Sequence, residues 1–179
     1  NRCIAGWLRG GGSWMAWVGV GHARDSLTGR DRVSVILPIC WGGGARSCID
    51  GLEGVVARFC SRKTVPTEAI EVETVMLMRE YRLLPDTQAA GRWRSGSVLV
   101  MELENTGLSA TMTARGLNRF HFRPWGVNGG AAGRIGEVVV NPGKPDERSI
   151  GKIKVLKLKR GDVVRMITGM LLNLGFLRN

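Results

Sequence analysis

Leu108-Ser109-Ala110-Thr111-Met112-Thr113-Ala114 is the stretch that decides the fold, because apolar and polar side chains alternate along it without a break. Successive side chains of a β-strand point to opposite faces of a sheet, so this alternation predicts a strand with one buried and one solvated face. Upstream, the apolar run from Val98 to Leu103 predicts a more fully buried strand. Downstream, the range Arg119 to Arg123 alternates around Phe120 and Phe122 and predicts another half-buried strand.

The two ends of the chain add further strands. Val33, Val35, Leu37 and Ile39 alternate with other residues and predict a strand with one well-buried face, which Pro38 limits to a sheet edge or a strand end. Thr28 to Asp31 reads as a turn before it.

Near the C-terminus, the apolar residues change parity. Ile153 and Val155 share one parity, whereas Leu156 and Leu158 share the other, which predicts a β-bulge or two strands joined by a bend. Arg160-Gly161-Asp162 is a turn, and Val163 to Ile167 is expected to pair as the next strand.

Two helix starts are visible. Asp50 can cap a helix over 50–60, with Glu53 three positions later and Leu52, Val55, Val56 and Phe59 on one face. Pro66 suits the first turn of a second helix over 66–72. The predicted class is α+β but mainly β, with antiparallel sheets in a sandwich- or barrel-like arrangement and one or two short helices in the N-terminal half. We divide it into residues 1–75, with glycine-rich strands and short helices, and the β-rich residues 76–179, without excluding a single domain.

Charge and cysteine content narrow the function classes. The 179 residues include 26 Lys+Arg and 15 Asp+Glu, a net charge of +11, which is compatible with a nucleic-acid or anionic-membrane partner without establishing one. No apolar run approaches the roughly 20 residues of a membrane span. The four cysteines form no CxxC pair, so we expect reduced thiols in a cytoplasmic protein rather than disulfides or structural zinc. The first residue is Asn1, so we expect a fragment whose beginning is missing.

The glycine-rich segment from Gly126 to Gly133 fits neither a dinucleotide-binding fingerprint nor a Walker loop. Two interpretations stay open: a glycine-rich connection between strands, or a cradle of backbone amides for an anion or oxyanion. His22 and His121 lack metal-ligand spacing, and no Gly-x-Ser-x-Gly nucleophile motif occurs. The sequence therefore assigns no metal ligand and no catalytic residue.

A basic run lies near the C-terminus, formed by Lys152, Lys154, Lys157, Lys159 and Arg160. Its interleaved residues are aliphatic, whereas aromatic residues that stack on bases are typical of single-strand nucleic-acid binding. We interpret the run as a solvated sheet face whose charges discourage edge pairing.

Seven motifs in order carry a resemblance. They are Trp41-Gly42-Gly43-Gly44-Ala45-Arg46, Asp50-Gly51-Leu52-Glu53-Gly54, Val65-Pro66-Thr67-Glu68, Tyr81-Arg82-Leu83-Leu84-Pro85-Asp86, Ala90-Gly91-Arg92-Trp93-Arg94-Ser95-Gly96, Pro124-Trp125-Gly126-Val127-Asn128-Gly129-Gly130 and Lys159-Arg160-Gly161-Asp162-Val163-Val164-Arg165. Together they resemble the C-terminal part of the hydantoinase B/oxoprolinase family, over about residues 19–168.

The resemblance implies a C-terminal fragment of an ATP-dependent hydrolase that opens hydantoin or 5-oxoproline rings. It implies a hydantoinase A-type ATPase partner, which uses the ATP, and a homo- or hetero-oligomer without a membrane. This fragment would bind no cofactor, and any metal would lie in the missing N-terminal half. The residues it suggests for binding are Gly42, Gly43, Gly44, Asp50, Arg92, Arg94, Trp125, Asn128, Gly129 and Gly130.

The chain departs from the family at one site that matters below. The family usually reads Asp-Ser-Gly-Gly where this chain has Asp86-Thr87-Gln88-Ala89. A diverged, non-catalytic scaffold or subunit-contact domain is therefore the alternative to an enzyme part, and nucleic-acid binding, which only the net charge favours, is the third hypothesis. We expect the isolated chain to have no ring-opening activity.

Overall fold

The computed structural model describes residues 18–25, 27–36, 42–45, 49–54, 65–88, 91–115, 120–126, 130–151 and 155–169. Nine strands and one helix lie in these ranges, so the predicted mainly β class is confirmed. They are β1 Val18–Arg24, β2 Asp31–Ile36, α1 Thr67–Glu73, β3 Met76–Leu84, β4 Val98–Asn105, β5 Ser109–Arg115, β6 Glu137–Val140, β7 Arg148–Ser149, β8 Leu156–Lys159 and β9 Val163–Ile167.

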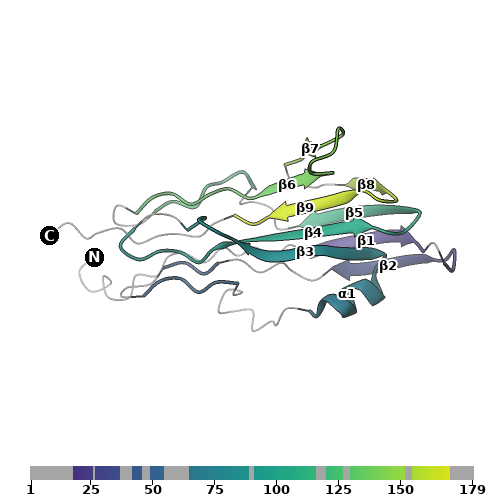
Figure 1. The fold of residues 1–179 in the computed structure, drawn as a ribbon, viewed down its shortest axis with the longest axis horizontal. Coiled ribbons are helices and arrows are strands. Elements are labelled where there is room, and N and C mark those ends of the chain that lie inside the picture. Colours follow the sequence, from purple (N-terminus) through teal and green to yellow (C-terminus); the bar gives the residue numbers. More distant parts are fainter. Residues whose placement is uncertain are drawn as a thin grey trace.

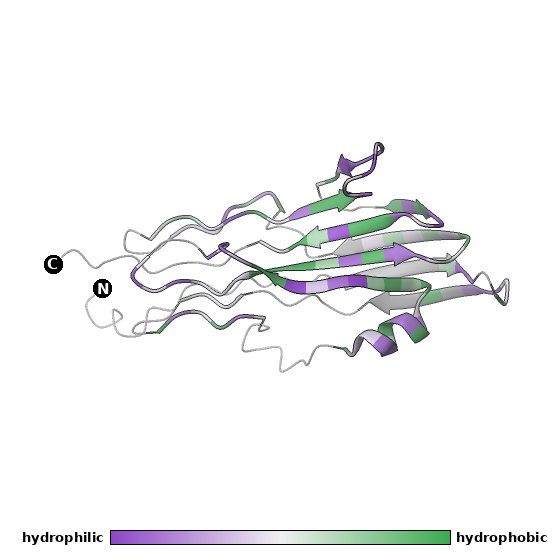
Figure 2. Cartoon of the chain, viewed as in Figure 1, coloured by the Kyte–Doolittle hydropathy of each residue, from purple (hydrophilic) through white to green (hydrophobic). Residues whose placement is uncertain are grey.

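The strands form two antiparallel sheets that face each other (Figure 1). One sheet has the order β2-β1-β5-β8 and the other β3-β4-β9-β6-β7, and every pairing is antiparallel. The first sheet joins strands from both sides of residue 75, and the division at that residue stays a prediction. Figure 2 shows hydrophobic stretches along β6 and β9 and hydrophilic ones along β3, an edge strand.

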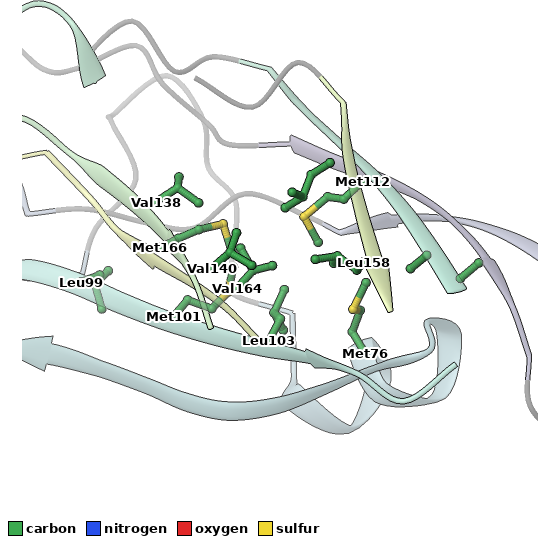
Figure 3. Close-up of a cluster of buried hydrophobic side chains, with 13 residues drawn as sticks. Met76, Leu99, Met101, Leu103, Met112, Val138, Val140, Leu158, Val164 and Met166 are labelled. Atoms are coloured by element: carbon green, nitrogen blue, oxygen red, sulfur yellow. The ribbon is translucent and has the colours of Figure 1, made fainter. Parts of the chain in front are cut away.

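The core lies between the sheets and draws on both of them (Figure 3). Met112 and Leu158 come from the first sheet, and Leu103, Val140 and Val164 come from the second. Each is at most 2% exposed, and burying an aliphatic side chain of this size contributes about 1.5–3 kcal/mol. The alternation that begins at Leu108 thus places Ala110 and Met112 in the core, as the sequence predicts, although Leu108 itself is 54% exposed.

Asn105, which is fully buried, ties together the two turns by which the chain crosses from one sheet to the other. After β4, its Oδ1 accepts a hydrogen bond from Gly107 N (3.1 Å). Between β8 and β9, its backbone N–H donates to Asp162 O (2.9 Å), and its Nδ2 donates to Lys159 O (3.0 Å). The predicted turn at 160–162 is confirmed, but β9 pairs with β4 and β6 in the second sheet and not with β8.

Asn141 closes the same end of the sandwich from β6. It has a left-handed backbone (φ 55°) and is 3% exposed. Its Nδ2 donates to Asp146 Oδ2 (2.6 Å) and to Asp162 Oδ1 (3.0 Å), and its Oδ1 accepts from Val163 N (2.9 Å). Burial alone would raise the pKa of Asp162, but the hydrogen bonds from Asn141 and Lys159 N, together with the charges of Lys144 and Lys159, hold that pKa below its usual value.

Helix α1 confirms the second predicted helix, which Pro66 precedes. Glu68 lies in its first turn, where a negative charge is favourable, and Ile70 is its buried residue. The side chain of Glu71, also in α1, accepts a hydrogen bond from Met78 N of the edge strand β3, which follows the helix (3.0 Å). The helix therefore occupies one edge amide that another strand would otherwise pair with.

Three predictions of local structure are wrong. Residues 120–122 form a turn rather than a strand; Phe120 packs against the core while Phe122 is 69% exposed, and Pro124, which has no N–H, follows. In β2, Val33 is 71% exposed, because Val33 pairs with His22 whereas the core residue Ala23 pairs with Arg32. The register of this edge strand therefore places Val33 on the face away from the core.

The third wrong prediction is the helix start at Asp50. Residues 49–54 are not helical, and Gly54 has φ 60°. Instead of capping a helix, Asp50 Oδ1 accepts a hydrogen bond from the distant Arg94 N (2.7 Å), so a tertiary partner replaces the local one. The rest of that predicted helix, 55–60, lies outside the described residues.

The parity change near the C-terminus also has an explanation. Leu156 and Leu158 are buried on β8, whereas Val155, just before the strand, is 64% exposed. The apolar residues of even number therefore belong to β8, whereas Val155, of odd number, precedes the strand. Ile153 lies outside the described residues.

Candidate functional site

Three of the sequence motifs meet where their backbones touch directly. We call this contact the glycine crossing, and it consists of Gly42, Gly43, Gly51 and Gly96. A Cβ on Gly42 would lie 2.3 Å from Gly96 O, one on Gly51 would lie 2.0 Å from Gly43 O, and one on Gly96 would lie 2.2 Å from Leu52 O. No side chain fits at these separations, so close backbone approach explains glycine at positions 42, 51 and 96.

Hydrogen bonds lock the glycine crossing. Gly43 N donates to Leu52 O (2.5 Å), Gly96 N donates to Gly43 O (2.9 Å), and Gly51 N donates to Arg94 O (2.7 Å). These three amides are directed at carbonyl groups of neighbouring segments. They therefore hold the three segments together and do not point into an open anion-binding site.

Asp50 and Arg94 extend the glycine crossing toward solvent. Besides accepting from Arg94 N, the Asp50 carboxylate lies 3.9 Å from Arg94 Nε through Oδ2, and both side chains are at least half exposed. Arg92, also exposed, places its guanidinium 5.9 Å from the ring centroid of Trp93. The structure thus brings together six predicted binding residues on or beside the glycine crossing: Gly42, Gly43, Gly44, Asp50, Arg92 and Arg94.

Next to the glycine crossing, three side chains from separate segments form a hydrogen-bonded group. Gln88 Nε2 donates to Ser97 Oγ (2.7 Å) and, more weakly, to Glu53 Oε1 (3.4 Å). Ser97 Oγ donates to the same Glu53 Oε1 (2.7 Å). We call Glu53, Gln88 and Ser97 the amide site; Ser97 is 3% exposed, Gln88 is half-buried and Glu53 is exposed.

Sequence reasoning assigned no binding role to the amide site. It interpreted Glu53 as a helix-capping residue and Gln88 as a departure from the family pattern. The only available signal was that departure, because polar residues in loops carry no periodicity. Thr87, another residue that departs from the family pattern, bridges the same segments: its Oγ1 donates to Leu84 O (2.7 Å) and accepts from Val98 N (3.0 Å).

The Pro124–Gly136 segment holds the other predicted site residues. Trp125 is 68% exposed, so its ring does not anchor the loop inside this chain. A Cβ on Gly126 would lie 1.7 Å from Gly130 O, and Gly133 N donates to Pro124 O (2.9 Å), so the loop folds tightly back on itself. Asn128 and Gly129 lie outside the described residues, and the role predicted for this loop stays a prediction.

The basic run lies on the outer face of the first sheet as far as it is described. On β8, Lys157 and Lys159 are exposed while Leu156 and Leu158 are buried, which agrees with a solvated face on an edge strand. Lys152 and Lys154 lie outside the described residues, as do all four cysteines. Within the part of the chain that the structure describes, no three His, Cys, Asp or Glu side chains gather as metal ligands, and no helix is long and apolar enough to cross a membrane.

Comparisons with known proteins support the family resemblance that the order of the motifs indicates. The model of the hydantoinase B/oxoprolinase family matches residues 4–169. An uncharacterized protein of Methanocaldococcus jannaschii, MJ0963, is 38% identical over 104 residues, which are 58% of this chain and 18% of that protein.

Two solved structures share the fold. The ATP-dependent caprolactamase from Pseudomonas jessenii matches with a TM-score of 0.66 and 16% identity, covering 90% of this chain and 30% of the caprolactamase chain. Nucleotide-free acetone carboxylase matches with a TM-score of 0.73 and 13% identity, covering 98% of this chain and 28% of the carboxylase chain. The chain therefore spans less than a third of the length of each of these relatives.

Proposed function

Because the chain belongs to the hydantoinase B/oxoprolinase family, we propose that it forms the C-terminal part of an ATP-dependent enzyme that opens cyclic amides such as hydantoin or 5-oxoproline. The observation that carries the proposal is the convergence of three family-like motifs on the glycine crossing. A fold shared with an ATP-dependent caprolactamase supports it.

The proposed reaction divides between two proteins. A cyclic amide is a poor electrophile, and a hydantoinase A-type ATPase partner would use ATP to phosphorylate the amide oxygen and so create a leaving group. The assembly would be a cytoplasmic oligomer, in which this chain binds no nucleotide and any metal belongs to a preceding region of the polypeptide.

The part of this chain in that reaction is to hold charged groups in place. The glycine crossing fixes the backbone on both sides of Arg94, and Arg92 and Arg94 extend from this rigid base toward solvent. Guanidinium groups bind carboxylates and phosphates well because their N–H donors form a planar fork. We assign them the binding of an anionic substrate group or phosphorylated intermediate.

A second candidate function is a non-catalytic scaffold or subunit-contact domain. The hydrogen bonds of Gly43, Gly51 and Gly96 to neighbouring carbonyls favour it, because these amides stabilise the fold and do not face an open site. In that case, Arg92 and Arg94 would contact a partner subunit instead of a substrate.

The test uses the complete protein that carries this chain, with and without its ATPase partner. Ring-opened products of hydantoin, 5-oxoproline and caprolactam are measured by mass spectrometry, and ADP is measured in parallel. We expect product only with ATP and partner present, and none from the 179-residue chain alone. Absence of ring opening by the complete assembly with all three amides would refute the proposal.

Variants separate the two candidate functions. Arg92→Ala with Arg94→Ala is compared with Arg148→Ala, an exposed arginine on β7. Loss of turnover with intact assembly supports substrate binding, whereas loss of assembly in a sizing column supports the subunit-contact role. Unchanged turnover and assembly would exclude both roles for these arginines.

A further inference from the structure

The amide site already holds an amide group, and this group belongs to the protein. Gln88 is the only glutamine of the chain, and its carboxamide N–H groups are directed at Ser97 Oγ (2.7 Å) and Glu53 Oε1 (3.4 Å). The two acceptors come from segments 44 residues apart, and the Ser97 hydroxyl is itself oriented by its hydrogen bond to Glu53. The acceptors are therefore fixed relative to each other independently of Gln88.

The chemistry of these acceptors matches one class of ligand. A hydroxyl oxygen and a carboxylate oxygen side by side accept hydrogen bonds from an amide N–H, and the carboxylate makes its bond stronger than a neutral pair would. Ser97 is buried, so its oxygen is screened from water, whereas Glu53 is exposed to solvent. Without a donor in place of Gln88, the Ser97 oxygen would keep its hydrogen bond to Glu53 but lose the one that it accepts, which favours an occupant.

We propose that Glu53 and Ser97 form a binding site for amide N–H groups, and that Gln88 occupies it as a tethered, self-inhibiting ligand. The class of external ligand is a secondary amide, with cyclic amides first among them. This choice rests on the proposed function, which supplies the cyclic amide as the substrate class. Removing the carboxamide of Gln88 vacates the position of its N–H groups between two oriented acceptors.

Because Gln88 is tethered, we expect free amides not to compete with it in the wild-type chain. A group attached to the same backbone has an effective concentration set by its short tether and not by the solution. A small neutral lactam has a single N–H donor where the Gln88 carboxamide has two, so its expected dissociation constant is on the order of 1 mM or weaker. It therefore displaces Gln88 only when the tethered carboxamide is absent.

The test measures binding directly, without ATP or a partner protein. Caprolactam is titrated into the wild-type chain and into Gln88→Ala, while backbone amide signals of Glu53 and Ser97 are followed by NMR. We expect saturable shifts in Gln88→Ala only, at millimolar lactam. N-methylcaprolactam, which lacks the N–H donor, and the double variant Gln88→Ala with Ser97→Ala are the matched controls, and neither is expected to give saturable shifts.

Several outcomes overturn the inference. Gln88→Ala that keeps its fold but shows no saturable shift, or that binds N-methylcaprolactam equally well, removes the amide site. A second measurement tests the inference even if that variant does not fold. When the single glutamine of the wild-type chain is selectively labelled, its side-chain N–H signals should be protected from exchange with water. Rapidly exchanging signals would contradict an occupied site. The binding measurement uses no ATP, so the two proposals can fail separately. Lactam binding without ATP-dependent ring opening would contradict the proposed function alone. ATP-dependent ring opening by the complete assembly without lactam binding to Gln88→Ala would contradict this inference alone.

Discussion

Gly96→Ala tests whether the glycine crossing holds this end of the protein together. The added Cβ would lie 2.2 Å from Leu52 O and 2.9 Å from Gly42 Cα, whereas ordinary contacts begin at 3.4 Å. The backbone of Leu52 or of Gly96 must then move by about 1 Å to reach van der Waals contact. The backbone φ of Gly96 is not in the left-handed region, so the whole effect arises from contact and not from dihedral strain.

The size of the effect follows from two terms. Overpacking costs about 1–3 kcal/mol, and weakening the bonds from Gly96 N to Gly43 O and from Gly43 N to Leu52 O adds about 0.5–1.5 kcal/mol each. We expect a loss of about 2–6 kcal/mol, which for a chain of this size lowers the Tm by roughly 4–24 °C.

Urea unfolding followed by fluorescence measures this loss, and Gly151→Ala is the matched control. A Cβ on Gly151 meets no atom within 4 Å, and its φ is not in the left-handed region, so that variant should stay within about 0.5 kcal/mol of wild type. If Gly96→Ala also stays within about 0.5 kcal/mol, the close approach does not exist in solution and the argument fails.

Three further changes probe the rest of the fold. Asn141→Ala removes three hydrogen bonds and leaves alanine at φ 55°, so we expect a loss of about 3–5 kcal/mol in urea unfolding, of which Asn141→Gly recovers about 1 kcal/mol. The pKa of Asp162 is lowered in the folded state, so the stabilisation by its carboxylate is complete above the unfolded value near 3.9 and is lost as the pH falls through the folded value. When unfolding is measured between pH 2 and 6, the free energy of unfolding should therefore decrease less on acidification for Asp162→Asn than for wild type. Arg165→Ala breaks an ion pair with Glu102, which is 9% exposed, and should cost about 1–3 kcal/mol, whereas Arg82→Ala, from a more exposed pair, should cost under about 1 kcal/mol; equal losses would contradict the role of burial.

Strands with strong local patterns could be predicted from the sequence. The alternation around Ala110 and Met112 and the apolar run of β4 both reflect side-chain burial, which is a property of successive residues. Two of the three failures occurred where a distant partner decided the outcome. Val33 took its face from its register with His22, and Asp50 accepted from Arg94 N instead of starting a helix.

The candidate site was only partly predictable for a related reason. The motif order pointed to the glycines and to Arg92 and Arg94, but it gave no reason for their glycine content. The reason is contact between the backbones of residues up to 54 positions apart in sequence, as between Gly42 and Gly96. Backbone contacts of this kind leave no periodic pattern, so only the coordinates reveal them.

The two departures at residues 87 and 88 have opposite physical consequences. Thr87 uses a hydroxyl to donate to Leu84 O and to accept from Val98 N, and a serine at this position has the same hydroxyl to offer, so this departure preserves the local connection. Gln88 differs, because a glycine has no side chain and would leave Ser97 and Glu53 without the carboxamide that they now bind. A single side chain thus determines whether the amide site is filled from within or open to a ligand. Divergence at this position alters ligand access while the glycine crossing beside it, built from backbone contacts, stays the same.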